Sequence, residues 1–349
     1  MKKLFCVLFK KDIRMMLSGK FFFIAFGSLV IYTLFINFGY VNFMNDKLYN
    51  VYVYDPEGTR QEASGAAGKA GEVKAVASRE ELDAALSADT NGVGIDASLS
   101  TPKIVMYAGS EKVDRHRADY ARSLLVLRSR YSAQPYPRSG SRHSARVVGT
   151  NTRELKQKKE MCCELLFIEI VAVGFLGIAS VLFKEKQMGV IRVHAILPLK
   201  RSLFILAKLV VFLLSDLVFA ALMTALNVGI NGAGDILPAM LVQTGILSII
   251  MALTGFGCAM LLPDFRQFSL AYLVIAVFAS VPVFLSANTS VKMAWIDWHP
   301  FYQIYMGLKG ACFGTPVIRP SYYILCACGI GLLFAAVWTA FRREMGKEG

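Results

Sequence analysis

The chain has 349 residues, of which 55% are hydrophobic and 18% are charged, and its mean hydropathy is +0.48. Soluble domains carry about 25% charged residues, so the composition excludes an ordinary soluble protein and indicates an integral membrane protein. The formal net charge of +13 favours anionic lipid headgroups as partners over nucleic acid, for which the sequence has no binding motif. The seven cysteines lie mostly in or beside apolar runs and do not predict a disulfide framework.

The N-terminal residues 1–20 alternate basic and apolar side chains, which predicts an amphipathic helix lying at the membrane surface. The apolar run 21–41 follows and has the length of about 20 residues that a transmembrane helix needs. Six basic residues and one acid precede this run, so the N-terminus is expected in the cytoplasm. A signal peptide is the alternative, but no small-residue cleavage site follows the run.

Residues 42–160 are polar and are expected to form a small extracytoplasmic α+β domain. Alternating apolar residues and turn signals predict strands in VYVYDPEGT, GVGIDASL and KIVMYAGS. Helices are predicted in SREELDAALSAD and DRHRADYARSLLVLRSRY. Ten basic residues and one acid occupy 122–159, and two interpretations stay open: a solvated loop, or a surface for outer-leaflet phosphates or an anionic substrate.

Five further apolar runs complete the chain, at 161–183, 203–230, 236–262, 267–287 and 321–341. Six spans place both termini in the cytoplasm and an aromatic-rich segment, 288–320, outside. The predicted fold is therefore an α-helical polytopic membrane protein with six transmembrane helices. An interfacial helix precedes the first span, and the α+β domain lies between the first and second spans.

The loop 184–202, KEKQMGVIRVHAILPLKRS, is a charged segment between two long apolar runs. It has five Lys/Arg and one acid, so it cannot lie in hydrocarbon and is expected on the cytoplasmic side. Because its interior is half apolar, it predicts a short amphipathic helix against the membrane that stops near Pro198.

The sequence lacks the common motifs of nucleotide-binding, metal-binding and hydrolytic sites. It has no GxxxxGK[ST] phosphate loop, no HExxH and no GxSxG, and its four histidines have no ligand spacing. Neither an enzyme nor a bound cofactor or metal is predicted. Two acids inside spans, Glu169 and Asp216, form a candidate intramembrane polar site. Three roles are open for these two acids. They could form a helix–helix hydrogen bond or line a cavity, they could belong to a proton or cation route, or they could contact the substrate.

The layout resembles permease subunits of the type-2 ABC exporter family, which have an amphipathic N-terminal helix, one span, an outer domain and five more spans. The first cytoplasmic loop of that family has an acid–basic–Gly pattern, an apolar stretch, a Pro followed by a basic residue, and a Lys in the next helix. The matching elements here are Glu185-Lys186, Gly189, Ile196-Leu197-Pro198, Lys200-Arg201 and Lys208. The sequence departs from the pattern at Val190, where the family often has Thr.

This resemblance implies an exporter subunit in the plasma membrane, most simply of a bacterium, that docks on a cytoplasmic ABC ATP-binding subunit. ATP and Mg would be bound by that partner, and the permease would pair with itself or with a second permease. The loop would be the coupling helix, with these contact residues: Glu185, Lys186, Met188, Gly189, Ile191, Leu197 and Pro198. Glu185 would pair with a basic residue of the partner or cap the loop helix, and Leu197 and Pro198 would fill an apolar notch. Met188 and Ile191 would pack on the membrane-facing side.

Two other classes of protein remain alternatives. A secondary transporter would show an inverted repeat and broken helices, whereas one span precedes the polar domain here and five follow it. A polytopic membrane sensor would use the polar domain as a receptor and would usually carry a cytoplasmic output module. Association with an ATP-binding subunit distinguishes the exporter from both.

Overall fold

A computed structural model describes most of the chain. The described residues are 2–18, 21–40, 49–56, 73–98, 103–108, 114, 117–121, 145–150, 152–191, 193, 200–288, 295–315 and 319–348. The chain divides into two units, Leu34–Lys158 and the combination of Met1–Thr33 with Lys159–Gly349. Each unit is described by itself below.

The larger unit is a helical bundle. Its helices are α1 (Lys2–Ser18), α2 (Phe21–Leu34), α6 (Thr152–Gln187), α8 (Arg201–Val228), α9 (Ile230–Leu261), α10 (Phe265–Asn288), α11 (Pro300–Cys312) and α12 (Pro320–Glu348). All of these except α1 and α11 are long and apolar enough to cross a membrane, α2 together with the π-helical turn Phe35–Tyr40 that continues it. The six predicted spans are thus confirmed as helices, and the chain is a polytopic helical membrane protein.

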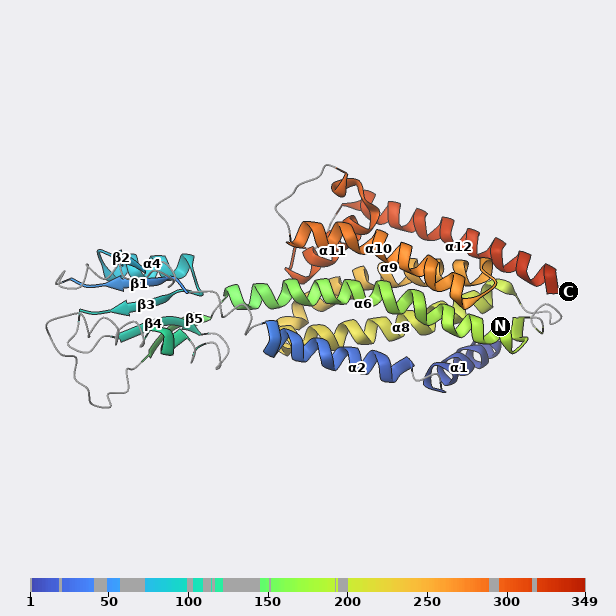
Figure 1. The fold of residues 1–349 in the computed structure, drawn as a ribbon, viewed down its shortest axis with the longest axis horizontal. Helices are drawn as coiled ribbons and strands as arrows, with labels where there is room; N and C mark the ends of the chain where they lie inside the picture. Colours follow the sequence, from blue (N-terminus) through green and yellow to red (C-terminus); the bar gives the residue numbers. More distant parts are fainter. Residues whose placement is uncertain are drawn as a thin grey trace. The chain divides into compact units, whose positions relative to one another are not determined.

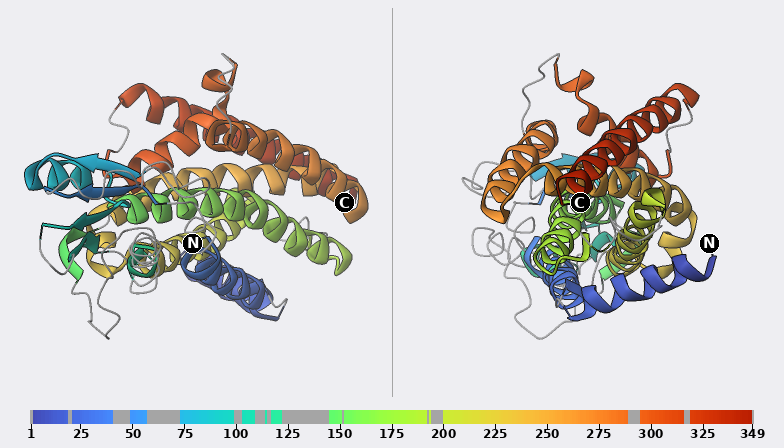
Figure 2. Two further views of the ribbon diagram at one scale, coloured as in Figure 1. Left: turned by 60° about the vertical axis from the view of Figure 1, so that its left-hand side comes forward. Right: turned by 90° about the vertical axis from the view of Figure 1, so that its right-hand side faces the viewer.

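Burial within the bundle is uneven. Helix α6 has the largest buried share of the six spanning helices, and it runs beside α8 and α9 (Figure 1 and Figure 2). Helices α2, α10 and α12 present large exposed apolar side chains, among them Phe23, Ile31, Leu273, Phe284 and Leu325. A surface of this kind is stable only against lipid or another apolar surface. Both chain ends lie at the same end of this unit, where α1 packs on α8 (Figure 1).

The segment before the last span contains a short 3₁₀-helix (Ile296–Trp298) and α11, which packs on α9 and α10. Pro300 occupies the first turn of α11, where its missing N–H has no cost. The buried face of α11 carries Ile304, Tyr305 and Leu308. Trp298 remains 88% exposed, as expected for an aromatic residue at an interface.

The smaller unit is built on a five-stranded sheet. Its strands are β1 (Val51–Tyr54), β2 (Val73–Val76), β3 (Val93–Asp96), β4 (Lys103–Ala108) and β5 (Ala145–Thr150), in the order β2-β1-β3-β4-β5. β1 is parallel to both β2 and β3, β3 is antiparallel to β4, and β4 is parallel to β5. Helix α4 (Arg79–Ala88) starts at Ser78, whose hydroxyl accepts from the Glu81 N–H as an N-cap.

Both faces of this sheet are covered. Leu82 and Leu86 of α4 pack with Tyr52 and Val105 on one face. On the other face, the helical residues 117–121 pack against the strands through Ala118 and Ala121. Strands β1, β3 and β4 and helix α4 lie where the sequence predicts them, whereas β2 and β5 are additions. Most of the basic stretch 122–159 and most of the predicted helix at 114–131 lie outside the described residues.

Helices α6 and α9 approach each other closely at Gly255. A Cβ atom placed on Gly255 would lie 2.5 Å from the carbonyl oxygen of Phe175 and 2.9 Å from Cγ2 of Ile178. Backbone atoms cannot move away as a flexible side chain can, so this position requires glycine.

We therefore predict that Gly255→Ala lowers the free energy of unfolding by about 1–3 kcal/mol, because the added methyl group overpacks the α6–α9 contact. The matched control is Gly234→Ala in the same helix, where no atom lies within 4 Å of the added Cβ. The control is expected to leave stability unchanged or slightly higher, since alanine favours helix over glycine. Thermal unfolding of both variants in mild detergent tests this, and equal midpoints would contradict it.

Candidate functional site

Four charged side chains from three helices meet at one end of the bundle. Lys208 of α8 places its Nζ 2.8 Å from Oε2 of Glu185, on α6, and 3.0 Å from Oδ1 of Asp12, on α1. Lys11 of α1 places its Nζ 2.6 Å from Oε1 of Glu185. These four residues, Lys11, Asp12, Glu185 and Lys208, are called the charge cluster below. Helix α1 is thereby joined to both α6 and α8.

Local sequence places each member of the charge cluster. Helix α1 buries one stripe, Leu8, Asp12 and Met16, at intervals of four residues, so its single acid points inward with two apolar neighbours. Glu185 lies in the last turn of α6, and Lys208 lies two turns into α8. The ends of α6 and α8 thus present opposite charges to the same face of α1.

Burial makes the pairing obligatory. The side chains of Glu185 and Lys208 are fully buried, that of Asp12 is 6% exposed, and that of Lys11 is 33% exposed. Two cations and two acids give a net charge of zero, and each carboxylate has an ammonium partner, as buried charges require. Burial raises the pKa of Asp12 above its ordinary value, and the charge of Lys208 opposes that rise.

An aromatic ring extends the charge cluster to two more helices. The ring centroid of Phe204 lies 4.8 Å from Lys208 Nζ and 5.9 Å from Lys11 Nζ, within the range of cation–π attraction. The same ring stacks on Phe341 of α12 at 5.1 Å and meets the edge of Phe256 of α9 at 6.4 Å. A displacement of α8 here therefore acts on α9 and α12 as well.

Lys186, the neighbour of Glu185, holds the same end of α6 from the other side. Its Nζ lies 2.9 Å from Oε1 of Glu344 on α12. It also donates to the carbonyl oxygens of Met260 and Leu262 at 3.4 Å each. These carbonyls close the C-terminus of α9, where a cation is favoured by the unpaired oxygens and the helix dipole. Glu185 and Lys186 together fasten α6 to four other helices.

A sharp turn follows directly. Gly189 has φ of +69°, a left-handed conformation that glycine adopts without strain, and it ends α6. A new helical turn begins at Val190, with the N–H of Val193 donating to the carbonyl of Gly189 at 3.1 Å. Ile191 is fully buried, whereas Met188 and Val193 are each 53% exposed. The turn thus anchors one apolar residue and presents two at the surface.

The structure changes the roles predicted for several loop residues. Glu185 was expected to pair with a basic residue of the partner or cap the loop helix; in the structure it is fully buried and pairs with Lys11 and Lys208 of this chain. Ile191 is buried, as a residue on the membrane-facing side would be, but Met188 is exposed. Leu197 and Pro198 lie outside the described residues. Asp12 and Lys11 were not predicted as site residues, although Asp12 is the only acid of a strongly basic helix.

The two intramembrane acids each have hydroxyl partners on a neighbouring helix. Oδ2 of Asp216 accepts from Ser248 of α9 at 2.6 Å. Glu169 accepts from Ser28 at 2.6 Å and from Tyr32 at 2.8 Å, both on α2. These bonds tie α8 to α9 and α6 to α2. Within the described part of the chain, no three His, Cys, Asp or Glu side chains group closely enough to hold a metal ion.

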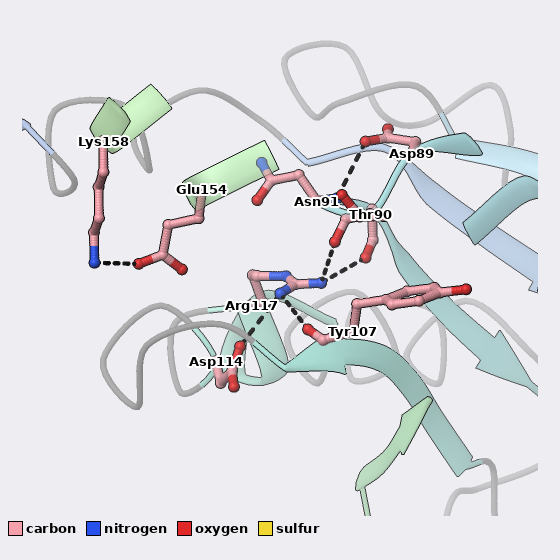
Figure 3. Close-up of polar contacts among 9 residues, drawn as sticks. Asp89, Thr90, Asn91, Tyr107, Asp114, Arg117, Glu154 and Lys158 are labelled. Atoms are coloured by element: carbon pink, nitrogen blue, oxygen red, sulfur yellow. Dashed lines mark hydrogen bonds and ion pairs between the residues drawn. The ribbon is translucent and has the colours of Figure 1, made fainter. Parts of the chain in front are cut away.

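The smaller unit has its own buried charge, Arg117. Its guanidinium donates to the carbonyl oxygens of Tyr107 and Gly92 at 2.9 Å and of Thr90 at 3.3 Å, and it pairs with Asp114 at 3.2 Å (Figure 3). Burial lowers its pKa, and the nearby Asp114 opposes that change. Because its bonds go mainly to carbonyl oxygens of the loop between α4 and β3 and of the end of β4, Arg117 stabilises the sheet. No surface of the guanidinium is left to bind a ligand.

Comparison with protein-family models, with curated proteins and with solved structures finds no match to this chain. The assignment of function therefore rests on the sequence and on the geometry described above.

For the charge cluster we predict that Lys208→Met lowers the free energy of unfolding by about 3–5 kcal/mol, because it leaves two buried carboxylates with only the partly exposed Lys11 as a cation. Methionine keeps most of the side-chain length, so the loss reflects charge rather than volume. Unfolding in a mixed-detergent titration measures it.

Lys200→Met is the matched control, since Lys200 is exposed at the start of the same helix. It is expected to change stability by less than about 0.5 kcal/mol. If the two substitutions lowered the free energy of unfolding equally, the buried Lys208 would contribute no more to stability than the exposed Lys200, which would contradict the prediction.

Proposed function

We propose that this chain is the transmembrane permease subunit of an ATP-driven ABC exporter in a bacterial plasma membrane. It moves its substrate out of the cytoplasm, using ATP and Mg bound by a separate cytoplasmic ABC ATP-binding subunit. Two permeases, identical or different, form the transport route. The observation that carries the proposal is the end of α6, where a firmly anchored helix turns at Gly189 into a short helical segment with exposed apolar side chains.

The energy source must come from outside this chain, because the sequence has no phosphate loop. A partner can drive a conformational change only if it binds two conformations with different affinity. The surface for such a partner is the turn after α6, where Met188 and Val193 are exposed beside the basic residues of the loop. Apolar contacts supply most of the affinity of a docking surface, while a single exposed ion pair contributes only about 0–1 kcal/mol.

Anchoring explains how a force at the turn would reach the whole bundle. Glu185 and Lys186 connect the end of α6 to α1, α8, α9 and α12. A turn that moves therefore carries these helices with it, or breaks buried ion pairs at a high energetic cost. The role of Glu185 in this proposal is thus to hold the turn in place, and contact with the partner falls to the exposed residues.

The first prediction of the proposed function concerns topology. A cysteine introduced at Ser87, exposed on α4, is expected to react with a membrane-impermeant thiol reagent in intact cells, because the proposed topology, with the basic N-terminus in the cytoplasm, has the smaller unit outside. A cysteine at Gln187, exposed at the end of α6, is the matched variant and is expected to react only after the membrane is opened. All native cysteines are replaced first. Labelling of Gln187→Cys in intact cells would contradict the topology.

The second prediction concerns coupling. Met188→Asp and Val193→Asp put a charge on the apolar docking surface, at two side chains that are each 53% exposed. Burial of that charge against the partner weakens binding of the ATP-binding subunit by about tenfold or more. Transport and substrate-stimulated ATPase activity of the co-purified complex are expected to fall together.

The control for coupling is Trp298→Asp, which adds the same charge at an exposed aromatic residue that precedes α11, in the segment expected outside. It is expected to keep the ATP-binding subunit bound and the ATPase stimulated. Normal transport and normal ATPase stimulation in both Met188→Asp and Val193→Asp would refute the docking surface. Absence of any ATP-binding subunit from the complex would favour the secondary transporter or the sensor.

A further inference from the structure

Helix α1 has an exposed stripe of cations and apolar side chains, opposite the buried stripe described above. It consists of Val7, Lys10, Arg14 and Leu17. Intervals of three, four and three residues place these positions on one side of a helix. All four side chains are exposed, and the residue exposures are 64% for Val7 and 53% for Leu17. These four residues are called the outer stripe below.

The two cations of the outer stripe have no acidic partner. Neither Lys10 nor Arg14 forms an ion pair or a side-chain hydrogen bond with any residue that the structure describes. Asp12, the only acid of the helix, lies on the buried side and pairs with Lys208. Lys10 and Arg14 are four residues apart, so their side chains are neighbours on the helix surface and repel each other. An anion bound between them would remove this repulsion.

Chain connectivity keeps α1 close to the membrane boundary. Two residues separate Ser18, the last residue of α1, from Phe21, the first residue of the spanning helix α2. Three Cα–Cα steps cover at most about 11 Å, so α1 ends beside the headgroup layer. Both views of Figure 2 show α1 at the rim of the bundle, where lipid can reach it.

We propose that the outer stripe binds the headgroup of an anionic phospholipid in the adjacent leaflet, with Val7 and Leu17 against the acyl chains. Arg14 offers paired N–H donors to a phosphate, and Lys10 adds a compact charge beside them. Apolar side chains that flank basic ones on a single face are typical of helices that lie in the headgroup region. The proposal rests on the membrane-spanning fold and does not depend on the exporter function.

A net negative charge on the lipid is required by the absence of acids from the outer stripe. A zwitterionic headgroup carries a cation of its own, which finds no carboxylate on this face and is repelled by Lys10 and Arg14. An anionic headgroup has no such repulsion, and cations near an anionic membrane surface are attracted to it.

Lipid bound at the outer stripe also acts on the charge cluster. Lys11 and Asp12 lie between Lys10 and Arg14 in sequence, and they join α1 to α6 and α8. A lipid that binds α1 only in its docked position therefore stabilises the folded bundle by mass action.

The test titrates the purified full-length protein, in a neutral detergent, with phosphatidylglycerol, phosphatidylcholine or inorganic phosphate, and measures the midpoint of thermal unfolding. Phosphatidylglycerol is expected to raise the midpoint until the site is saturated, and high salt is expected to weaken this effect because the cations are exposed. Phosphatidylcholine and inorganic phosphate are expected to raise it far less.

The variant that tests the outer stripe combines Lys10→Gln with Arg14→Gln. It is expected to need about tenfold or more phosphatidylglycerol for the half-maximal shift, since each cation near an anionic surface contributes a factor of about five. The matched control combines Lys103→Gln on β4 with Arg319→Gln before α12, two exposed cations away from α1. It is expected to respond to phosphatidylglycerol like the native protein.

Four outcomes would overturn the proposal. Two are equal midpoint shifts with phosphatidylglycerol and phosphatidylcholine, and a native response to phosphatidylglycerol in the Lys10→Gln, Arg14→Gln variant. An equally large shift with inorganic phosphate would assign the cations to a soluble anion. Loss of a co-purified ATP-binding subunit from that variant, with the lipid response intact, would assign the outer stripe to a protein partner.

Discussion

The buried ion pairs between α1, α6 and α8 are the constraint on which the bundle depends. Lys208 is fully buried and has two carboxylate partners, one 23 residues before it in sequence and one 196 residues before it. Removing any one member leaves an uncompensated charge away from water. This lowers the stability of the fold by far more than an exposed ion pair raises it. The position of the N-terminal helix is therefore fixed by charge, in addition to the apolar contacts of Leu8 and Met16.

This arrangement bears directly on how the bundle could move. Helix α6 is the most buried spanning helix, and it is fastened at its end to four neighbours by Glu185 and Lys186. Farther along the bundle, its polar contacts with other helices include the hydroxyls of Ser28 and Tyr32 on Glu169 and the ion pair of Glu160 with Lys309 of α11 at 3.3 Å. At Gly255 the backbones of α6 and α9 touch closely. Rigid-body motion of the fastened helices is thus favoured over sliding of α6 within the bundle.

Hydropathy was sufficient to predict the spans, because a run of about 20 apolar residues with few charges matches the hydrocarbon thickness of a membrane and is stable there. Alternation and turn residues likewise predicted β1, β3 and β4, whose inward residues form a two-sided core. Strands β2 and β5 were not predicted, because four to six residues with little alternation carry no clear signal.

The roles of single charges were harder to predict. Glu185 stands between two lysines and looked exposed, but its partners Lys11 and Lys208 are on two other helices, and nothing local to residue 185 indicates that it is buried between them. Arg117 was missed for the same reason, since its partners are carbonyl oxygens that sequence does not display. Asp12 had a local signal, as a lone acid at the centre of an apolar stripe on a basic helix.

A double-mutant cycle on Glu185 and Lys208 tests the central claim most directly, because it isolates their interaction from the effect of each residue alone. The free energy of unfolding in detergent would be measured for the native protein, Glu185→Gln, Lys208→Met and the double variant. We expect the double variant to be more stable than the sum of the single losses predicts, with a coupling of at least about 1 kcal/mol. Additive losses, within about 0.5 kcal/mol, would show that these charges do not act as one buried unit and would contradict the account.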